Sequence, residues 1–316
     1  MSARKIKVGV VGVGSLGKNH ARIYASLPEA ELVGLYDTDH ARAAALAAEY
    51  KTRAFDRLED LLGGLEAASV VVPTDLHHPI ASPLLERGIH VLVEKPIASS
   101  TQEAVDMVAL ARRHNAILQV GHVERFNPVL TFLDQVGRPP RFIEAHRLAP
   151  YPPPREGLPP RGTEVSVVLD LMIHDLEVIL HVVGAPVADI HAVGVPVLSP
   201  SEDIANVRLR FQNGAVANVT ASRISPERMR KIRVFYEDTY ISLDYQNQSG
   251  ELFRKTASGI AREDIAIEKG EPLANELRSF LGCVARRGQP VVSGEHAAGA
   301  LTLAVEITRR IREGGS

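Results

Sequence analysis

The stretch KVGVVGVGSLGKNHARIY, residues 7 to 24, constrains the fold of this chain more than any other. A valine-rich run leads into three glycines with the spacing Gly12-x-Gly14-x-x-Gly17, and a helical pattern follows directly. Between a strand and a helix, the first glycine permits a tight turn, the second lets a pyrophosphate approach the backbone, and the third allows close packing. The pattern predicts a dinucleotide-binding loop at the positive end of a helix, although glycines can also simply turn a chain. The predicted contacts are Gly12, Val13, Gly14, Ser15, Leu16 and Gly17.

An acidic residue after the next apolar run indicates which dinucleotide this loop would take. The run ELVGLYD ends at Asp37, twenty positions beyond Gly17. A carboxylate at this place accepts hydrogen bonds from the adenosine ribose hydroxyls, and it would repel a 2′-phosphate. The sequence therefore predicts NAD as the cofactor in preference to NADP, with Arg42 as the residue that could still accept a phosphate.

The arrangement of apolar runs predicts two domains. Residues 5 to 121 alternate strands with helical patterns, which is typical of a doubly wound parallel sheet, so residues 1–121 are predicted to form an α/β Rossmann domain. The predicted strands are Ile6 to Val11, Glu31 to Tyr36, Ala68 to Val72, His90 to Val93 and Ile117 to Val120. Residues 122–316 are richer in β-branched alternation and contain the hairpin signal Asn213-Gly214. We expect there an α+β substrate-binding and oligomerisation domain with an open, mainly antiparallel sheet. Its last helix packs either within this domain or back on the first domain.

Charged residues at the end of the fourth strand are candidates for chemistry. HVLVEKPIAS, residues 90 to 99, passes from an apolar strand to Glu94, Lys95 and Pro96. Ligands of parallel sheets bind outside the carboxyl ends of the strands, where Thr74 and His122 should also lie. The Lys95 amine is suited to hydrogen-bonding a substrate hydroxyl. The alternative is a surface ion pair.

The apolar helical stretch VSVVLDLMIHDLEVILHVVG, residues 165 to 184, carries a narrow polar stripe. Asp170, His174, Glu177 and His181 follow one another at intervals of four, three and four, which places them on one helical face. Histidine exchanges protons near neutrality, and Asp170 can orient its ring. We expect His174 to be a general base, or else a satisfied histidine on a wet face, and we expect Asp175 to be structural.

Composition narrows the class of protein. The net charge is −2 and the pI is about 6.6, so neither nucleic acid nor a membrane surface is expected as a partner. Cys283 is the single cysteine, and the N-terminus shows no signal-peptide layout, which favours a cytoplasmic location. His20, His77 and His78 have no carboxylates at matching spacing, so no metal is expected.

Three segments, GVVGVGSLG, VEKP and Asp170-x-x-x-His174, resemble those of the Gfo/Idh/MocA family of nicotinamide-dependent sugar oxidoreductases. The resemblance extends over nearly the whole chain, including VVPTDLHHP, residues 71 to 79. It implies that Lys95, Asp170 and His174 form the catalytic group. It also implies cofactor contacts from Pro73, Thr74, His77, Glu94 and Lys95. Thr74 stands where many members carry asparagine.

Two further segments, 120–130 and 161–180, are similar to those of family members that oxidise the 3-hydroxyl of UDP-N-acetylglucosamine. A nucleotide sugar carries a diphosphate, which arginine binds well. The proline-rich residues 149–163 are expected to form a loop that borders the ligand, or else an exposed connector. The predicted substrate contacts are Lys95, Glu124, Arg125, Arg147, Arg161, Asp170 and His174. Arg155 also lies in a segment that is expected to border the substrate cleft.

The expected reaction is oxidation of a sugar hydroxyl, in which a hydride passes to NAD. His174 would accept the hydroxyl proton while Lys95 stabilises the oxygen, or the two roles would be exchanged. Three other readings remain open: an oxidoreductase of a free sugar or cyclitol, an NAD-dependent glycosidase of the same family, and a non-catalytic NAD sensor. The open sheet is expected to form a homodimer or homotetramer interface.

Overall fold

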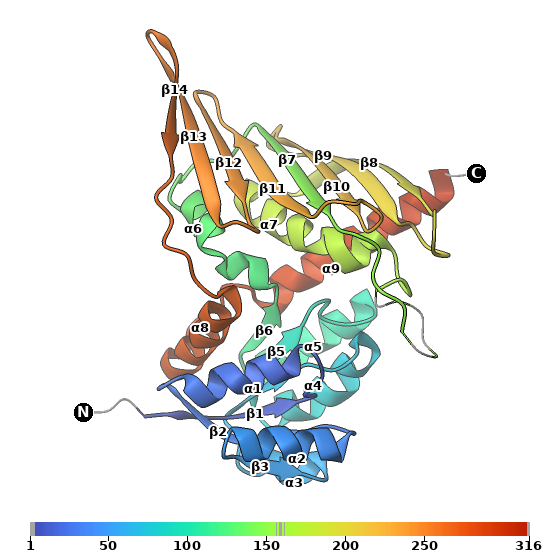
Figure 1. Cartoon of the computed structure of the whole chain (residues 1–316), viewed down its shortest axis with the longest axis vertical. Helices are drawn as coiled ribbons and strands as arrows, with labels where there is room; N and C mark the ends of the chain where they lie inside the picture. Colours follow the sequence, from blue (N-terminus) through green and yellow to red (C-terminus); the bar gives the residue numbers. More distant parts are fainter. Residues whose placement is uncertain (1–3, 156, 158–159, 161, 315–316) are drawn as a thin grey trace. The chain divides into compact units, whose positions relative to one another are not determined.

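The computed structural model describes residues 4–155, 157, 160 and 162–314 (Figure 1). The chain divides into two compact units. The first unit comprises Met1–Val123 and Glu271–Ala298, and the second comprises Glu124–Gly270 and Gly299–Ser316. This division differs from the predicted one, 1–121 and 122–316, because residues 271–298 return to the first unit.

Within the described residues, the first unit is built on a six-stranded parallel sheet with the strand order β3-β2-β1-β4-β5-β6. This is the order of a Rossmann domain, in which the direction of winding reverses between β1 and β4. The strands are β1 (Ile6–Val11), β2 (Ala30–Tyr36), β3 (Arg53–Phe55), β4 (Ala67–Val70), β5 (His90–Glu94) and β6 (Leu118–Gly121). The helices between them are α1 (Gly17–Ser26), α2 (His40–Glu49), α3 (Leu58–Leu62), α4 (His77–Glu86) and α5 (Thr101–Arg113).

The five predicted strands of this unit are confirmed to within two residues at their ends. The short strand β3 and helix α3 were not predicted, because three and five residues are too short to show a period. Helix α8 (Pro272–Arg286) also belongs here, since Leu277 and Phe280 are fully buried in the same core as Val8 and Tyr24. Beyond α8, Val120 of β6 donates a backbone hydrogen bond to Val292.

The second unit contains an eight-stranded sheet with the order β14-β13-β12-β11-β7-β10-β9-β8 in the described chain (Figure 1). Only the pair β7 and β10 is parallel among its described neighbours, so the sheet is mainly antiparallel as predicted. The strands are β7 (Phe142–Leu148), β8 (Val187–Val195), β9 (Ile204–Phe211), β10 (Val216–Ser222), β11 (Met229–Phe235), β12 (Thr239–Asp244), β13 (Ser249–Thr256) and β14 (Gly259–Asp264). Strand β7 was missed because its inward face carries Arg147 beside Ile143 and Ala145, and this buried charge breaks the apolar alternation.

Helices cover one face of this sheet. Residues of α6 (Pro128–Asp134), α7 (Ile173–Val183) and α9 (Gly294–Gly314) share a buried core with the inward residues of the strands. The other face carries a row of aromatic rings across neighbouring strands. Phe235 and Tyr240 stack at 4.5 Å between centroids, and Tyr240 and Phe253 stack at 4.9 Å. One turn of π-helix, η3 (Val168–Met172), precedes α7.

Candidate active site

The glycine loop between β1 and α1 shows which of its glycines the protein itself requires. Gly12 has a φ of +87°, and a Cβ there would overlap the backbone of Val71. A Cβ at Gly17 would overlap the carbonyl oxygen of Gly12. A Cβ at Gly14, in contrast, would have as its nearest atom Nη1 of Arg42 at 3.9 Å. Packing explains the first and third glycines and does not explain the second.

The surroundings of this loop fit a dinucleotide. The first turn of α1, from Gly17 to His20, contains a lysine and no carboxylate, so its own side chains leave the positive helix end free to attract an anion. Leu16 and Leu76, on two loops at the carboxyl ends of the strands, are about two-fifths exposed at 41% and 40%. Exposed leucines and an uncapped positive helix end at one edge suit a ligand with both rings and phosphates.

Asp37 follows β2, as predicted, and is nearly buried. Its Oδ2 accepts a hydrogen bond of 2.7 Å from the Val13 N–H, and its Oδ1 accepts one of 2.8 Å from Asp39. Asp37 therefore holds the glycine loop in place. Nη1 of Arg42 lies 3.7 Å from Asp37 and its Nη2 lies 2.7 Å from Asp39. A phosphate on Arg42 would meet two carboxylates, which supports the preference for NAD.

The end of β5 holds the Glu94–Lys95 pair. The Lys95–Pro96 peptide bond is cis. Oε2 of Glu94 accepts the Lys95 backbone N–H at 3.3 Å, and Oε1 lies 3.2 Å from Nε2 of His20. Burial raises the pKa of Glu94, but its interactions with His20 and Lys95 outweigh this effect and hold the pKa below its ordinary value. The sequence assigned no role to His20, because 74 residues separate it from Glu94.

Two other predicted cofactor residues of this unit are buried. His77 places Nδ1 2.9 Å from the Pro96 carbonyl and Nε2 3.0 Å from the Val72 carbonyl. Its ring therefore connects the loop after β4 to the loop after β5, and burial lowers its pKa. His122 follows β6 and is 1% exposed. Pro73 is exposed and Thr74 begins a short 3-10 helix at the expected edge.

In the second unit, the π turn alters the predicted polar stripe. Asp170 lies within η3 and His174 in the first turn of α7, and both are partly buried. A π-helical turn contains about one residue more than an α-helical turn, so the α-helical spacing used in the prediction does not apply between these two residues. The backbone of Gly162 lies directly against the Asp170 carboxylate, since a Cβ at Gly162 would overlap it. π turns occur frequently at functional sites.

The rest of the stripe has other partners. Glu177 is fully buried and accepts a hydrogen bond of 2.8 Å from Arg125. Burial raises the pKa of Glu177 to about 7, and the Arg125 guanidinium counteracts part of the rise. His181 lies 2.7 Å from Asp134 at the end of α6.

Two predicted substrate residues, Glu124 and Arg147, form an internal charge cluster with Asp175. Arg147 donates to both oxygens of Asp175, at 2.6 and 3.2 Å, and to Oε1 of Glu124 at 2.9 Å. Burial raises the pKa of Glu124, but Arg147 outweighs it, so that pKa is lowered. Carboxylates of the same unit thus occupy the guanidinium groups of Arg125 and Arg147. Asp175, expected to be structural, is the main partner of Arg147.

The cluster has one member that reaches solvent, and the sequence did not single it out. Arg230 lies 3.3 Å from Glu124, and 48% of its side chain is exposed. The sequence does not distinguish Arg230 from other arginines, except by its position on the inward face of β11 two residues from Ile232.

The proline-rich loop is tied to the sheet by a buried arginine. Arg223 donates to Asp203 at 2.8 Å and to the carbonyl oxygens of Gly162 and Val165 at 2.5 and 2.9 Å. Arg155 of the loop forms an exposed pair with Glu164 at 2.8 Å. Arg161 lies outside the described residues. The end of the loop next to Asp170 is therefore anchored.

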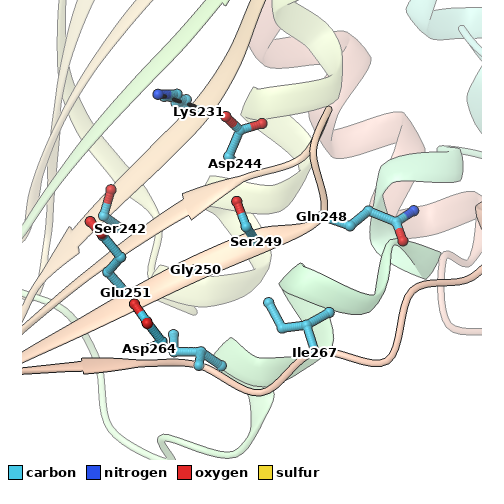
Figure 2. Close-up of a pocket in the computed structure, with 10 residues that line it drawn as sticks. Lys231, Ser242, Asp244, Gln248, Ser249, Gly250, Glu251, Asp264 and Ile267 are labelled. Atoms are coloured by element: carbon cyan, nitrogen blue, oxygen red, sulfur yellow. Dashed lines mark ion pairs between the residues drawn. The ribbon is translucent and has the colours of Figure 1, made fainter.

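Two cavities lie elsewhere in the units. One in the second unit has a volume of about 340 Å³ and is lined by β11, β12, β13 and residues 264–267 (Figure 2). The other, in the first unit, has a volume of about 670 Å³ between α5 and residues 287–295. Neither lining contains a predicted site residue. Among the described residues, no three histidine, cysteine or acidic side chains are grouped to hold a metal ion. None of the helices described here has both the length and the hydropathy needed to cross a bilayer.

Comparison with known proteins agrees with this geometry. Residues 6–122 match the profile described as oxidoreductase family, NAD-binding Rossmann fold, and residues 135–242 match the GFO/IDH/MocA C-terminal domain. The chain is 36% identical to UDP-N-acetylglucosamine 3-dehydrogenase of Acidithiobacillus ferrooxidans over 97% of this chain and 96% of that one. A solved structure of that enzyme superposes with a TM-score of 0.91, at 35% identity, over 97% of this chain and 98% of the other. The NAD-dependent scyllo-inositol 2-dehydrogenase of Bacillus subtilis is 25% identical over 98% of this chain and 95% of its own. The chain therefore belongs to the Gfo/Idh/MocA family of NAD-dependent oxidoreductases.

Proposed function

We propose that this enzyme oxidises the 3-hydroxyl of a UDP-N-acetylglucosamine-type nucleotide sugar to the 3-keto sugar. The observation that carries the proposal is the 36% identity, over 97% of the chain, to a UDP-N-acetylglucosamine 3-dehydrogenase. The 0.91 TM-score to the structure of that enzyme supports it further. The buried cysteine and the use of NAD fit a cytoplasmic enzyme.

The first unit supplies the cofactor site in this proposal. The glycine loop and the start of α1 bind the pyrophosphate, and Asp37 accepts hydrogen bonds from the adenosine ribose hydroxyls. Glu94 and Lys95 at the end of β5, with Pro73 and Thr74 after β4, border the nicotinamide half. The bound cofactor supplies hydride acceptance, which no protein side chain can provide. His77 and His122 act by positioning the loops, because both are buried.

The second unit supplies the proton-transfer group. We assign His174 as the base that takes the proton of the sugar hydroxyl, and Asp170 as the carboxylate that steadies the ring. Lys95 orients the hydroxyl oxygen and stabilises its developing negative charge. The exchange of roles between Lys95 and His174 predicts a different pH profile for each single variant, and the profile of kcat decides between them.

The diphosphate contact is reassigned within the second unit. Internal carboxylates already bind Arg125 and Arg147, so these arginines stabilise the segment that carries Glu124 and Asp175. Arg230 has the exposure that binding a diphosphate requires, with 48% of its side chain accessible. Arg230→Met should raise KM for the nucleotide sugar.

The decisive experiment incubates the purified enzyme with NAD and one candidate substrate at a time. UDP-N-acetylglucosamine should produce NADH, read at 340 nm, and a product that gains one deuterium on reduction with borodeuteride. N-acetylglucosamine and scyllo-inositol should produce little NADH. NADH production with inositol alone would establish a cyclitol dehydrogenase, for which the Bacillus subtilis relative provides the precedent. Release of free N-acetylglucosamine without net NADH would establish a glycosidase, and NAD binding without turnover of any sugar would indicate a sensor.

The assembly is proposed to be a homodimer or homotetramer through the uncovered face of the second unit's sheet. Phe142, Phe235, Tyr240 and Phe253 form the aromatic row on this face. Rings on an uncovered sheet face are typical of an interface. Light scattering should give a mass of two or four chains, and Tyr240→Lys should lower it. A monomeric mass for the unmodified protein would refute the proposal.

A further inference from the structure

A chain of buried hydrogen bonds runs through the first unit to the Glu94 carboxylate. The Tyr24 hydroxyl lies 2.9 Å from Oγ of Ser69, and that atom lies 3.2 Å from Nδ1 of His20. Nε2 of His20 lies 3.2 Å from Oε1 of Glu94. His20 and Tyr24 are each 1% exposed and Ser69 is fully buried. Three elements, α1, β4 and β5, therefore meet in one polar line inside an apolar core.

One arrangement of protons gives every donor in this hydrogen-bond chain an acceptor. With a neutral imidazole, the Tyr24 O–H donates to Ser69, and the Ser69 O–H donates to Nδ1 of His20. Nε2–H of His20 then donates to Glu94. Each of the three protons meets one acceptor in this order, and a fully satisfied buried network holds its members rigidly. The order fixes the tautomer in which Nε2 faces the carboxylate.

Glu94 is confined from a second side. A Cβ at Gly121 would lie 3.0 Å from the Cδ, Oε1 and Oε2 atoms of Glu94. The carboxylate therefore rests against the backbone at the end of β6 while His20 holds its Oε1. Its Oε2 accepts the Lys95 N–H at 3.3 Å, so the same carboxylate fixes the backbone of Lys95.

We propose that His20 is a positioning residue for the nicotinamide end of the cofactor site. It keeps Glu94 ionised and in one orientation, so that this carboxylate can accept from the hydroxyl and amide donors of the nicotinamide half. The inference rests on the proposed function only in placing the nicotinamide beside Glu94, and it holds for any sugar substrate. Tyr24 and Ser69 act through His20 by fixing its tautomer.

Binding of two ligands separates this role from general support of the fold. NADH contains the nicotinamide riboside, whereas ADP lacks it, and neither measurement requires a sugar. His20→Leu keeps much of the volume but removes both nitrogen atoms. It should raise the Kd of NADH about tenfold, the factor expected for one lost charge-assisted hydrogen bond, and change the Kd of ADP less than about twofold. His20→Gln retains an N–H donor at similar reach and should restore most of the NADH affinity.

Three further variants complete the test. His114→Leu, the same substitution at the far end of α5, should leave both affinities unchanged. Tyr24→Phe should weaken NADH binding less than His20→Leu does. In a Glu94→Gln background, His20→Leu should add no further loss, because its partner is already altered.

Equal loss of NADH and ADP affinity in His20→Leu would overturn the proposal, as would a His20→Gln variant no better than His20→Leu. Additive losses in the double variant would overturn it too. If the unmodified protein bound ADP but gained nothing from the nicotinamide riboside of NADH, the placement of the cofactor would fail, and with it the proposed function.

Discussion

Buried carboxylates in the two units have different hydrogen-bond partners, as Glu94 and Asp175 show. In the first unit, Glu94 has an imidazole and a backbone N–H as hydrogen-bond partners, and 13% of its side chain reaches the surface. In the second unit, Asp175 is bound by both forks of the Arg147 guanidinium and is almost completely buried. A guanidinium neutralises a carboxylate and encloses it, whereas a histidine holds it and leaves an edge accessible. The partner of a buried charge thus distinguishes a group that stabilises the fold from one that can meet a ligand.

The largest effect in this comparison is expected from breaking the enclosed cluster. Arg147→Met leaves Asp175 and Glu124 without their shared cation, so the free energy of unfolding should fall by about 3–5 kcal/mol. Chemical denaturation followed by circular dichroism measures the change. Arg141→Met, at an exposed position just before β7, is the matched control and should cost less than about 0.5 kcal/mol. Equal effects of the two substitutions would show that the cluster contributes no stability.

The next largest effect concerns turnover rather than stability. His174→Ala should lower kcat by about 100-fold, the usual contribution of a positioned proton acceptor, and leave the Kd of NAD unchanged. His191→Ala, on exposed β8, should leave kcat as it is. Steady-state kinetics with the substrate found in the panel provides both numbers, and an unchanged kcat would remove His174 from the mechanism.

A smaller effect should appear in the pH dependence of stability. Burial raises the pKa of Glu177 from 4.5 to about 7. A carboxyl group whose pKa is raised by folding adds stability that is complete below pH 4.5 and is lost as the pH rises through 7. In the unmodified protein this loss should be on the order of 2 kcal/mol. Glu177→Gln should flatten the curve between these values, and a curve of unchanged slope would contradict the assignment.

The smallest effect is expected at the glycine loop, where the same glycine-to-alanine change should weaken NAD binding at one position and lower stability at another. Gly14→Ala should leave thermal unfolding unchanged and weaken NAD binding about tenfold, because a Cβ there would meet only Nη1 of Arg42, at an unstrained 3.9 Å. Gly12→Ala should lower the midpoint of unfolding, since its φ is +87° and the backbone of Val71 is in contact. Calorimetry and cofactor titration on the two variants test the distinction. A loss of stability in Gly14→Ala equal to that in Gly12→Ala would show that packing, not a ligand, requires Gly14.

Local sequence patterns predict most of the fold but only part of the candidate site. The glycine loop, Asp37 and the Glu94–Lys95 pair could be predicted as one site because a parallel sheet gathers its strand ends at one edge. The contact of His20 with Glu94 was missed because it joins residues 74 positions apart. The carboxylate partners of Arg125 and Arg147 were not predicted, because a sequence shows a charge without its partner. The π turn at Asp170 was not predicted, since residue spacing alone does not distinguish it from an α turn.

The return of α8 to the first unit has a consequence for synthesis of the chain. Leu277 and Phe280 complete a hydrophobic core whose other members begin at Ile6. A ribosome must therefore translate the whole eight-stranded sheet before the nucleotide-binding core is full. Chaperones would meet the amino-terminal half with part of its apolar surface still uncovered. The domain translated first is thus the one that finishes folding late, and a gene fragment that stops at residue 123 would encode an aggregation-prone product.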